Sequence, residues 1–338
     1  MGTRQFAVCD NDREYLRMFQ AYLQKQNPAD YEIVVFDTVN QALAASCENA
    51  FEILLVGEKI YDKNVIKIKA TKVFILQEDG LSGITQYSMI AKYQSMEKLI
   101  AQVLDEFALD DSFNSVGRCG KNKTSLLSFY APDRQKGQSA AALGAAQVLA
   151  DMGNKVLYIN LLPFTGFEEL LRTSYESDVT DFLYFVLNHS DKLLYKLNSI
   201  KQCVHGVDYL PPVLDYADLL HISGQDWERM MDTLLYSSDY THIVMDLSET
   251  CQGFYHILGR SDRIYLLTDC DTSYGRAMLS HYKKLLKEKD YGVLLDNSIE
   301  FSLPSGWEHH SERLENISVS PVGVCMKGVL DMCGMCEK

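Results

Sequence analysis

The sequence of 338 residues lacks the features that mark membrane, exported or nucleic-acid-binding proteins. It has no apolar run near the ~18 residues that a membrane-spanning helix needs. Its first residues contain no apolar stretch of signal-peptide length, and Phe6 stands where a myristoylation signal requires Ser or Thr. Lys and Arg number 32 against 46 Asp and Glu, and the net charge of −14 disfavours nucleic-acid binding. A cytoplasmic protein is therefore expected.

Common catalytic and metal-binding patterns are also missing. We find no Ser-His-Asp order, no H-E-x-x-H and no G-x-G-x-x-G. The nine cysteines are an odd number and are scattered, which predicts reduced thiols rather than a disulfide framework. Cys325, Cys333 and Cys336 lie near the end of the chain, the last two as Cys-x-x-Cys. A structural zinc site needs four ligands, so free thiols are favoured, and the role of these three residues stays open.

The length of the chain predicts two domains at ~150 residues per domain. Residues 109–123 are polar, contain two glycines and show no helical period, which indicates a linker between domains at 1–108 and 124–338. On each side of it, apolar strand-like runs alternate with amphipathic helical patterns. This alternation favours an α/β fold with two doubly wound domains, each a parallel sheet covered by helices. Beyond Pro304 an irregular tail is expected.

The individual elements follow from hydrophobic periodicity and capping residues. Strands are expected at residues 5–9, 31–36, 53–56, 72–76, 86–91, 125–131, 155–159, 208–210, 242–245, 263–267 and 292–295. Helices are expected at about 13–26, after Thr38, after Ser95, and at 139–152, 178–188, 223–236 and 273–289. Thr38 and Ser95 are candidate N-caps because their hydroxyls can accept a backbone hydrogen bond.

Acidic and basic residues in the first domain stand at the ends of expected strands. Asp10 and Asp12 follow the first strand, Gly57 follows the third, and Lys92 follows the fifth. In this order the domain resembles a response-regulator receiver, which has a flavodoxin-like fold. The resemblance implies a Mg²⁺-binding acidic cluster at Asp10 and Asp12 and a phospho-accepting Asp at the position of Gly57. Glycine offers no nucleophile, so the sequence predicts a pseudo-receiver. The alternative is a flavodoxin-like domain whose acidic residues merely end a strand.

The second domain carries a strand, loop and helix over residues 125–152 and a second strand over 153–160. A Leu-Pro-Pro turn lies at 210–212, and a further strand over 240–246 ends in Asp246. In this order the domain resembles the ParA/MinD group of P-loop ATPases. It is most similar to the CpaE-like branch of Flp/Tad pilus assembly, which joins a receiver-like domain to such an ATPase.

The resemblance implies a degenerate nucleotide site. Its phosphate loop consists of Asp133, Arg134, Gln135, Lys136, Gly137, Gln138 and Ser139. Gln138 stands at the position of the phosphate-binding Lys, Asp133 where the group places a second Lys, and Asn160 where it has a catalytic Asp. Ser139 and the Walker B-like Asp246 remain for Mg²⁺. A charge-assisted hydrogen bond to phosphate contributes ~1.5–3 kcal/mol, so these changes predict weak or absent ATP binding. The structural interpretation is that Ser139 only caps a helix.

The combined motifs predict a non-catalytic localisation, scaffold or regulatory protein that needs no cofactor. Its expected partners are proteins, such as pilus or secretion machinery, with a homodimer as a further option. Membrane contact is expected to be weak, because residues 324–335 have Lys327 as their only cation, and docking of this segment on its own domain is favoured. The alternative is an active ATPase that binds ATP and Mg²⁺ and switches between a monomer and an ATP-bound dimer. A DNA-partitioning role fits the net charge poorly.

Overall fold

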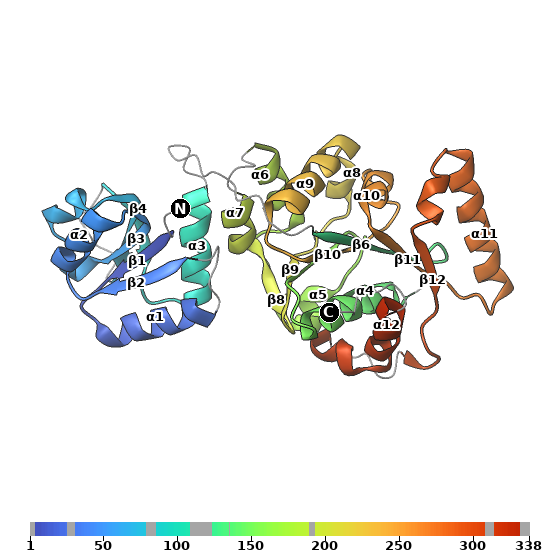
Figure 1. The fold of residues 1–338 in the computed structure, drawn as a ribbon, viewed down its shortest axis with the longest axis horizontal. Helices are drawn as coiled ribbons and strands as arrows, with labels where there is room; N and C mark the ends of the chain where they lie inside the picture. Colours follow the sequence, from blue (N-terminus) through green and yellow to red (C-terminus); the bar gives the residue numbers. More distant parts are fainter. Residues whose placement is uncertain are drawn as a thin grey trace. The chain divides into compact units, whose positions relative to one another are not determined.

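The computed structural model describes residues 4–25, 31–78, 86–108, 124–134, 136–188, 193–307 and 314–331 (Figure 1). The chain divides into two compact units, residues 1–115 with 194–199 and residues 116–193 with 200–338. The expected linker at 109–123, Gln135 of the phosphate loop, and Cys333 and Cys336 lie outside the described residues. Within the described ranges, no helix has the length and apolar character needed to cross a membrane.

The first unit contains a five-stranded parallel sheet with the order β2-β1-β3-β4-β5. Its strands are β1 (Gln5–Cys9), β2 (Glu32–Phe36), β3 (Phe51–Gly57), β4 (Ala70–Gln77) and β5 (Ser88–Ala91). Its helices are α1 (Arg13–Lys25), α2 (Val39–Glu48) and α3 (Met96–Ala108), joined by residues 194–199 of α7 (Leu193–Ile200). This strand order is the flavodoxin-like one, in which ligands bind at the carboxyl ends of the strands.

Alternation along β1 explains why helices cover both faces of this sheet. Ala7 shares a core cluster with Ala42 of α2, whereas Phe6 packs on Phe19 of α1, because successive side chains point to opposite faces. Both expected N-caps are confirmed. The hydroxyl of Thr38 accepts from the backbone N–H of Gln41, and the hydroxyl of Ser95 accepts from that of Lys98 at 3.3 Å.

The second unit contains a seven-stranded sheet with the order β12-β11-β6-β10-β7-β9-β8, parallel except for β8. Its strands are β6 (Ser125–Tyr130), β7 (Val156–Asn160), β8 (Gln202–Val204), β9 (Val207–Leu210), β10 (His242–Asp246), β11 (Arg263–Leu267) and β12 (Ser298–Phe301). Its helices are α4 (Gln138–Asp151), α5 (Phe167–Leu171), α6 (Val179–Asn188), α8 (Ala217–Leu220), α9 (Gly224–Ser237), α10 (Phe254–Arg260), α11 (Ser273–Glu288) and α12 (Pro321–Asp331). In Figure 1, α4 and α12 lie on one side of the sheet and α9 and α10 on the other.

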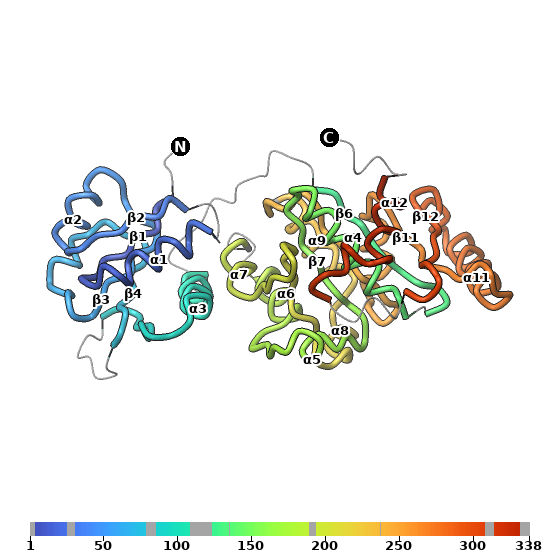
Figure 2. The backbone as a smooth tube through the Cα atoms, turned by 90° about the horizontal axis from the view of Figure 1, so that it is seen from below, coloured from blue at the N-terminus to red at the C-terminus, as the bar shows by residue number. Residues whose placement is uncertain are grey.

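Helix α4 is buried on most of its surface, since it lies between the sheet and α12 (Figure 2). Its small residues allow this close packing. A side chain at Gly144 would lie 2.9 Å from a methyl group of Ile317, so glycine makes room for the segment that precedes α12. Val322 and Met326 of α12 belong to the same core cluster as α4. The expected docking of residues 324–335 on their own domain is confirmed for residues 324–331, and residues 332–335 lie outside the described ones. The expectation of an irregular tail is wrong for residues 321–331.

Two further expectations need correction. Residues 292–295 form a 3₁₀ turn, and the edge strand is β12, because a short apolar run does not distinguish a strand from a helical turn. Ser139 is not the N-cap of α4. That position is held by Gly137, and Ser139 lies inside the first turn with its hydroxyl available for another contact.

Candidate functional site

Four of the expected site residues of the second unit meet at the carboxyl ends of three neighbouring strands, namely Gln138, Ser139, Asn160 and Asp246. The strand order places β10 between β6 and β7, and in the register of the sheet Asp246 lies opposite both Phe129 and Asn160. The loop after β6 leads into α4, so Gln138 and Ser139 reach the same edge. In open parallel sheets this edge is the usual ligand-binding position.

Asp246 is the centre of a closed hydrogen-bond network. Its side chain is fully buried. Its Oδ1 accepts from Nε2 of Gln138 at 2.6 Å. Its Oδ2 accepts from the hydroxyl of Ser139 at 2.6 Å, and also from the hydroxyl of Tyr158 at 2.9 Å and Nδ2 of Asn160 at 3.0 Å. Both carboxylate oxygens therefore have donors from the protein itself.

Burial sets the protonation of this carboxyl group. Removal from water raises the pKa of Asp246 to about 6, although the hydrogen bonds from Ser139, Gln138 and Tyr158 favour the ionised form. The pKa of Tyr158 is raised as well, first by burial and then by the neighbouring Asp246. The phenol thus stays a neutral donor. Asp246 is ionised at neutral pH only because the protein surrounds it with donors.

Gln138 is directed into the sheet at the position expected for the phosphate-binding Lys. Besides its bond to Asp246, its Nε2 lies 2.8 Å from the carbonyl oxygen of Leu247 and 3.3 Å from that of Phe129. The side chain is buried. Its amide group is consequently committed to contacts inside the protein.

The rest of the expected phosphate loop is spread over different environments. Asp133 accepts a hydrogen bond from the backbone N–H of Asp269 at 3.2 Å. Arg134 is exposed, has a φ of 55° and lies 4.0 Å from Glu249. A positive φ is unfavourable for a residue with a side chain, so Arg134 adopts at some energetic cost a conformation that glycine would adopt more easily. Lys136 is exposed, and the four side chains that donate to Asp246 include neither Arg134 nor Lys136.

Gly137 is covered by residues that the sequence did not connect with the site. A side chain at Gly137 would lie 2.3 Å from a methyl group of Leu303 and 2.9 Å from the indole ring of Trp307. Both residues follow β12, about 170 positions further along the chain. Tyr158 is a further residue of the Asp246 network that the sequence analysis did not name. The sequence could have indicated it, because Tyr158 precedes Asn160 by two residues on one strand and so shares its face.

In the first unit, the structure brings together Asp10, Gly57 and Lys92. Nζ of Lys92 lies 2.9 Å from Oδ2 of Asp10 and 2.9 Å from Oε1 of Glu78, and the three side chains are almost fully buried. Desolvation opposes the charge of Lys92, but its hydrogen bonds to Asp10 and Glu78 outweigh this and raise its pKa. Asp12 is exposed instead, and its carboxylate accepts from backbone N–H groups that begin α1.

The absence of a side chain at Gly57 is what allows the Asp10–Lys92 pair. A Cβ atom at Gly57 would lie 2.3 Å from Oδ2 of Asp10. The backbone of Gly57 has a φ of −60°, which any residue adopts, so steric room and not conformation requires glycine here. Among the described residues, no group of three His, Cys, Asp or Glu side chains is arranged to hold a metal ion.

We expect Gly57→Ala to lower the free energy of unfolding by about 2 kcal/mol, since the new methyl group displaces the carboxylate of Asp10 from Lys92. Gly259→Ala is the matched control, because nothing lies within 4 Å of a Cβ atom at that helical position. It should be neutral or slightly stabilising. Urea denaturation of both variants measures the difference, and equal stability of the two would contradict this account.

No protein-family model matches the sequence, and no curated protein does either. Solved structures are similar at low identity. A ParA family ATPase from Chlorobium tepidum TLS is 14% identical, with 61% of this chain and 97% of that chain covered and a TM-score of 0.48. A putative plasmid partition protein from Borrelia burgdorferi B31, solved with AMPPNP, is 12% identical, with 63% and 98% covered and a TM-score of 0.45. A chain of the MinC:MinD complex of Aquifex aeolicus is 14% identical, with 55% and 70% covered and a TM-score of 0.40.

Proposed function

We propose that this protein is a non-catalytic scaffold or localisation protein of the ParA/MinD type, in which the former nucleotide site has become part of the core. One observation carries the proposal. The buried carboxylate of Asp246 accepts hydrogen bonds from four side chains of its own chain, and one of them is Gln138, at the position of the phosphate-binding Lys.

The residues present do not fit Mg·ATP. In P-loop proteins a Lys neutralises the phosphates, while a Ser or Thr hydroxyl and an Asp order the metal shell. In this chain the position of that Lys is held by Gln138, which is neutral, and the hydroxyl of Ser139 donates to Asp246. Each buried hydrogen bond that a ligand breaks without replacement costs ~1–3 kcal/mol. Leu303 and Trp307 also cover the glycine that begins the helix.

The first unit supports the same role by a parallel arrangement. Its Asp10 is paired with Lys92 and held against Gly57, so no carboxylate stands ready to accept a phosphoryl group. We interpret this unit as a pseudo-receiver, a domain that acts through its surface. The assignment to pilus or secretion machinery rests on the resemblance of the motif order to CpaE-like proteins, and it makes protein partners the ones to look for.

The alternative function, an active ATPase with an unusual loop, keeps two features. Ser139 and Asp246 lie within 2.6 Å of each other, as a metal-binding pair would before Mg²⁺ arrives. The alternative requires the amide of Gln138 to leave the Asp246 network and the segment with Trp307 to move away from Gly137.

We expect no saturable binding of Mg·ATP up to ~1 mM and no phosphate release above the buffer rate, because no cation meets the γ-phosphate. Calorimetry and the fluorescence of Trp307, which contacts the loop, both report binding. Ser139→Ala is the control and should behave like the wild type. A dissociation constant in the ~µM range, or turnover that Ser139→Ala abolishes, would establish the alternative.

A further inference from the structure

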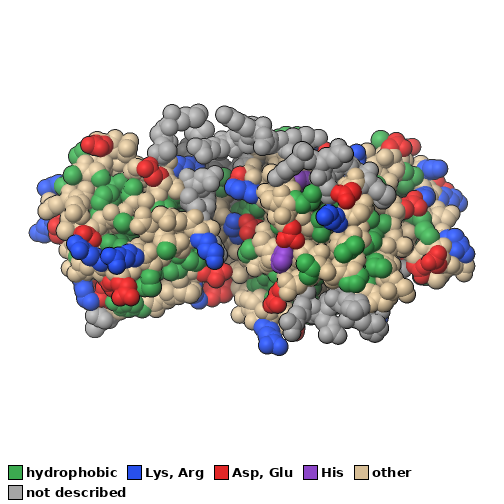
Figure 3. All heavy atoms as spheres, turned by 60° about the horizontal axis from the view of Figure 1, so that its bottom comes forward, with side chains coloured by type: hydrophobic (Ala, Val, Ile, Leu, Met, Phe, Trp, Pro, Cys, Tyr) green, Lys and Arg blue, Asp and Glu red, His purple; other side chains and the backbone are tan. Residues whose placement is uncertain are grey.

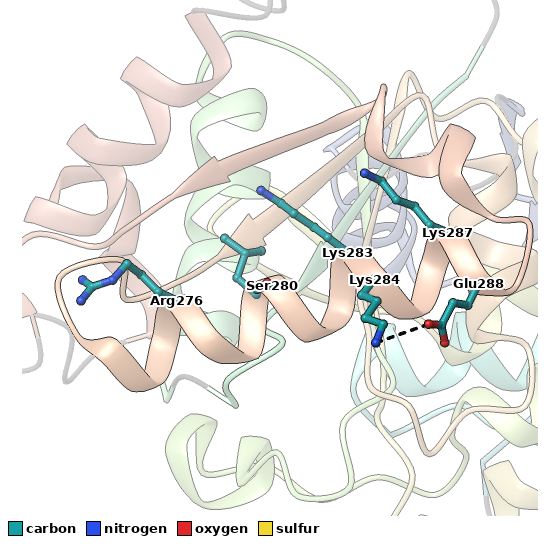
Figure 4. Close-up of a pocket in the computed structure, with 7 residues that line it drawn as sticks. Arg276, Ser280, Lys283, Lys284, Lys287 and Glu288 are labelled. Carbon is teal, nitrogen blue, oxygen red and sulfur yellow. Dashed lines mark ion pairs between the residues drawn. The ribbon is translucent and has the colours of Figure 1, made fainter.

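Helix α11 carries a basic strip, which we define as Arg276, Lys283, Lys284 and Lys287. Figure 3 shows Lys and Arg side chains gathered at the end of the second unit that α11 forms. The residues follow a helical spacing and line a shallow groove of about 650 Å³, whose floor includes Leu279 (Figure 4). Glu288 is the only acidic residue of α11. In a chain with net charge −14, this strip is a local reversal of sign.

The opposite end of the same sheet carries an acidic face, formed by the segments after β7 and β9. The segments are neighbours, since the backbone N–H of Val179 donates to Pro211 at 3.0 Å. Across residues 161–181 and 211–221, Arg172 is the only Lys or Arg. The acidic residues there are Glu168, Glu169, Glu176, Asp178, Asp181, Asp215 and Asp218.

Apolar side chains project from the acidic face. Phe164 is 85% exposed and Leu214 is 89% exposed. The ring of Phe164 lies 6.0 Å from that of Tyr216 in an edge-on arrangement, so the two segments present one apolar knob. Large apolar side chains this exposed are typical of contact sites when they cluster within a charged rim.

We propose that the acidic face of one copy docks on the basic strip of a second copy. Phe164 and Leu214 then enter the groove of α11, where Leu279 and the aliphatic stems of the lysines receive them. The two surfaces lie at opposite ends of one sheet, at β7 and β9 and at β11 and β12, so they cannot meet within one molecule. The contact is head-to-tail, and such contacts join subunits into rings or open chains larger than a dimer.

Charge selects this occupant over the alternatives. A symmetric contact of face on face or strip on strip would bring like charges together, which costs free energy. A nucleic acid is disfavoured because the protein that carries the strip has a net charge of −14. Lys284 and Lys283 pair with Glu288 and Glu300, and the acidic face adds further carboxylates to these ion pairs. The assembly needs no nucleotide, so it is independent of whether the Asp246 site binds one.

The test is sedimentation velocity of the full chain from ~5 to ~200 µM at low salt, a range that detects weak association. The average mass should rise past that of a dimer. Raising the salt to ~0.5 M should weaken association at least tenfold, because charge attraction is screened. Association that requires Mg·ATP, or a protein that stays monomeric throughout, would overturn the proposal.

Charge reversal identifies the surfaces. Lys284→Glu with Lys287→Glu alters the strip, and Glu169→Lys with Asp218→Lys alters the face; these side chains are exposed. Each pair should weaken association at least tenfold, and a chain that carries all four changes should associate again. Leu214→Ser should weaken it too, whereas Val324→Ser, 68% exposed on α12, should not. Failure of the fourfold variant to recover, with the fold intact by circular dichroism, would contradict head-to-tail docking, as would tight binding of the strip to duplex DNA.

Discussion

Asp246→Ala is expected to lower the free energy of unfolding by about 3 kcal/mol at neutral pH, because four buried donors lose their common acceptor. The amide of Gln138 still donates to two backbone carbonyl oxygens in the variant, so the total loss is smaller than the cost of four unpaired donors. If Asp246 belonged to a catalytic site, the same substitution would be expected to raise the free energy of unfolding. A buried carboxylate kept for a metal ion destabilises the empty protein, and its removal then stabilises the fold.

The pH dependence of the same variant gives a second readout. The pKa of Asp246 is raised to about 6 in the folded state, against ~3.9 in an unfolded chain. The folded protein therefore binds the proton more tightly, and the contribution of Asp246 is greatest below pH ~4 and declines as the pH rises to ~6. The deficit of Asp246→Ala should accordingly be larger at pH 4 than at pH 7.

Urea denaturation at both pH values measures these effects. Ser139→Ala is the graded control, because it removes one donor and leaves three, and it should cost about 1 kcal/mol. If Asp246→Ala were as stable as the wild type at neutral pH, the carboxylate would not be a structural acceptor, and the nucleotide-binding alternative would gain its strongest support.

Much of this site could be predicted because the hydrophobic pattern shows where each strand ends. Asn160 and Asp246 each end an apolar run, and parallel strands bring such ends to one edge. Tyr158 shares a face with Asn160 because side chains two residues apart on a strand point the same way. The direction of the Gln138 amide has no such signal, since it depends on whether a ligand or Asp246 offers the better acceptor.

Contacts between distant segments were not predictable. Leu303 and Trp307 reach Gly137 only because β12 pairs with β11 and returns the chain to the site. The apolar run at 292–295 suggested the edge strand too early, since its length suits a turn of helix equally well. The assignment of residues 194–199 to the first unit likewise has no local pattern in the sequence.

The two units arrive at the same chemical result with different residues. In each unit, a buried Asp lies at the edge of the parallel sheet where ligands usually bind, and a neighbouring side chain contacts its carboxylate in place of a ligand. Gln138 does so with a neutral amide in the second unit, and Lys92 does so with a full charge in the first. The ionic pair is the more costly to break, because removing one partner leaves an uncompensated charge in the core.

Lys92→Met is therefore expected to have the largest effect of any single change, a loss of about 3–5 kcal/mol in the free energy of unfolding. Methionine nearly matches the length of lysine, so packing is largely kept. The loss arises because Asp10, 1% exposed, and the buried carboxylate of Glu78 no longer have their shared cation. The raised pKa of Lys92 means that its contribution is lost only as the pH rises beyond its usual value of ~10.4.

Two companion variants make this result specific. Lys59 also pairs with Glu78 but is exposed, so Lys59→Met should cost less than about 1 kcal/mol. Adding Asp10→Asn to Lys92→Met removes the uncompensated charge and should restore part of the stability. Chemical denaturation near pH 7 measures all three. If Lys92→Met were tolerated as well as Lys59→Met, Asp10 would not depend on Lys92, and its carboxylate would be free to serve a ligand.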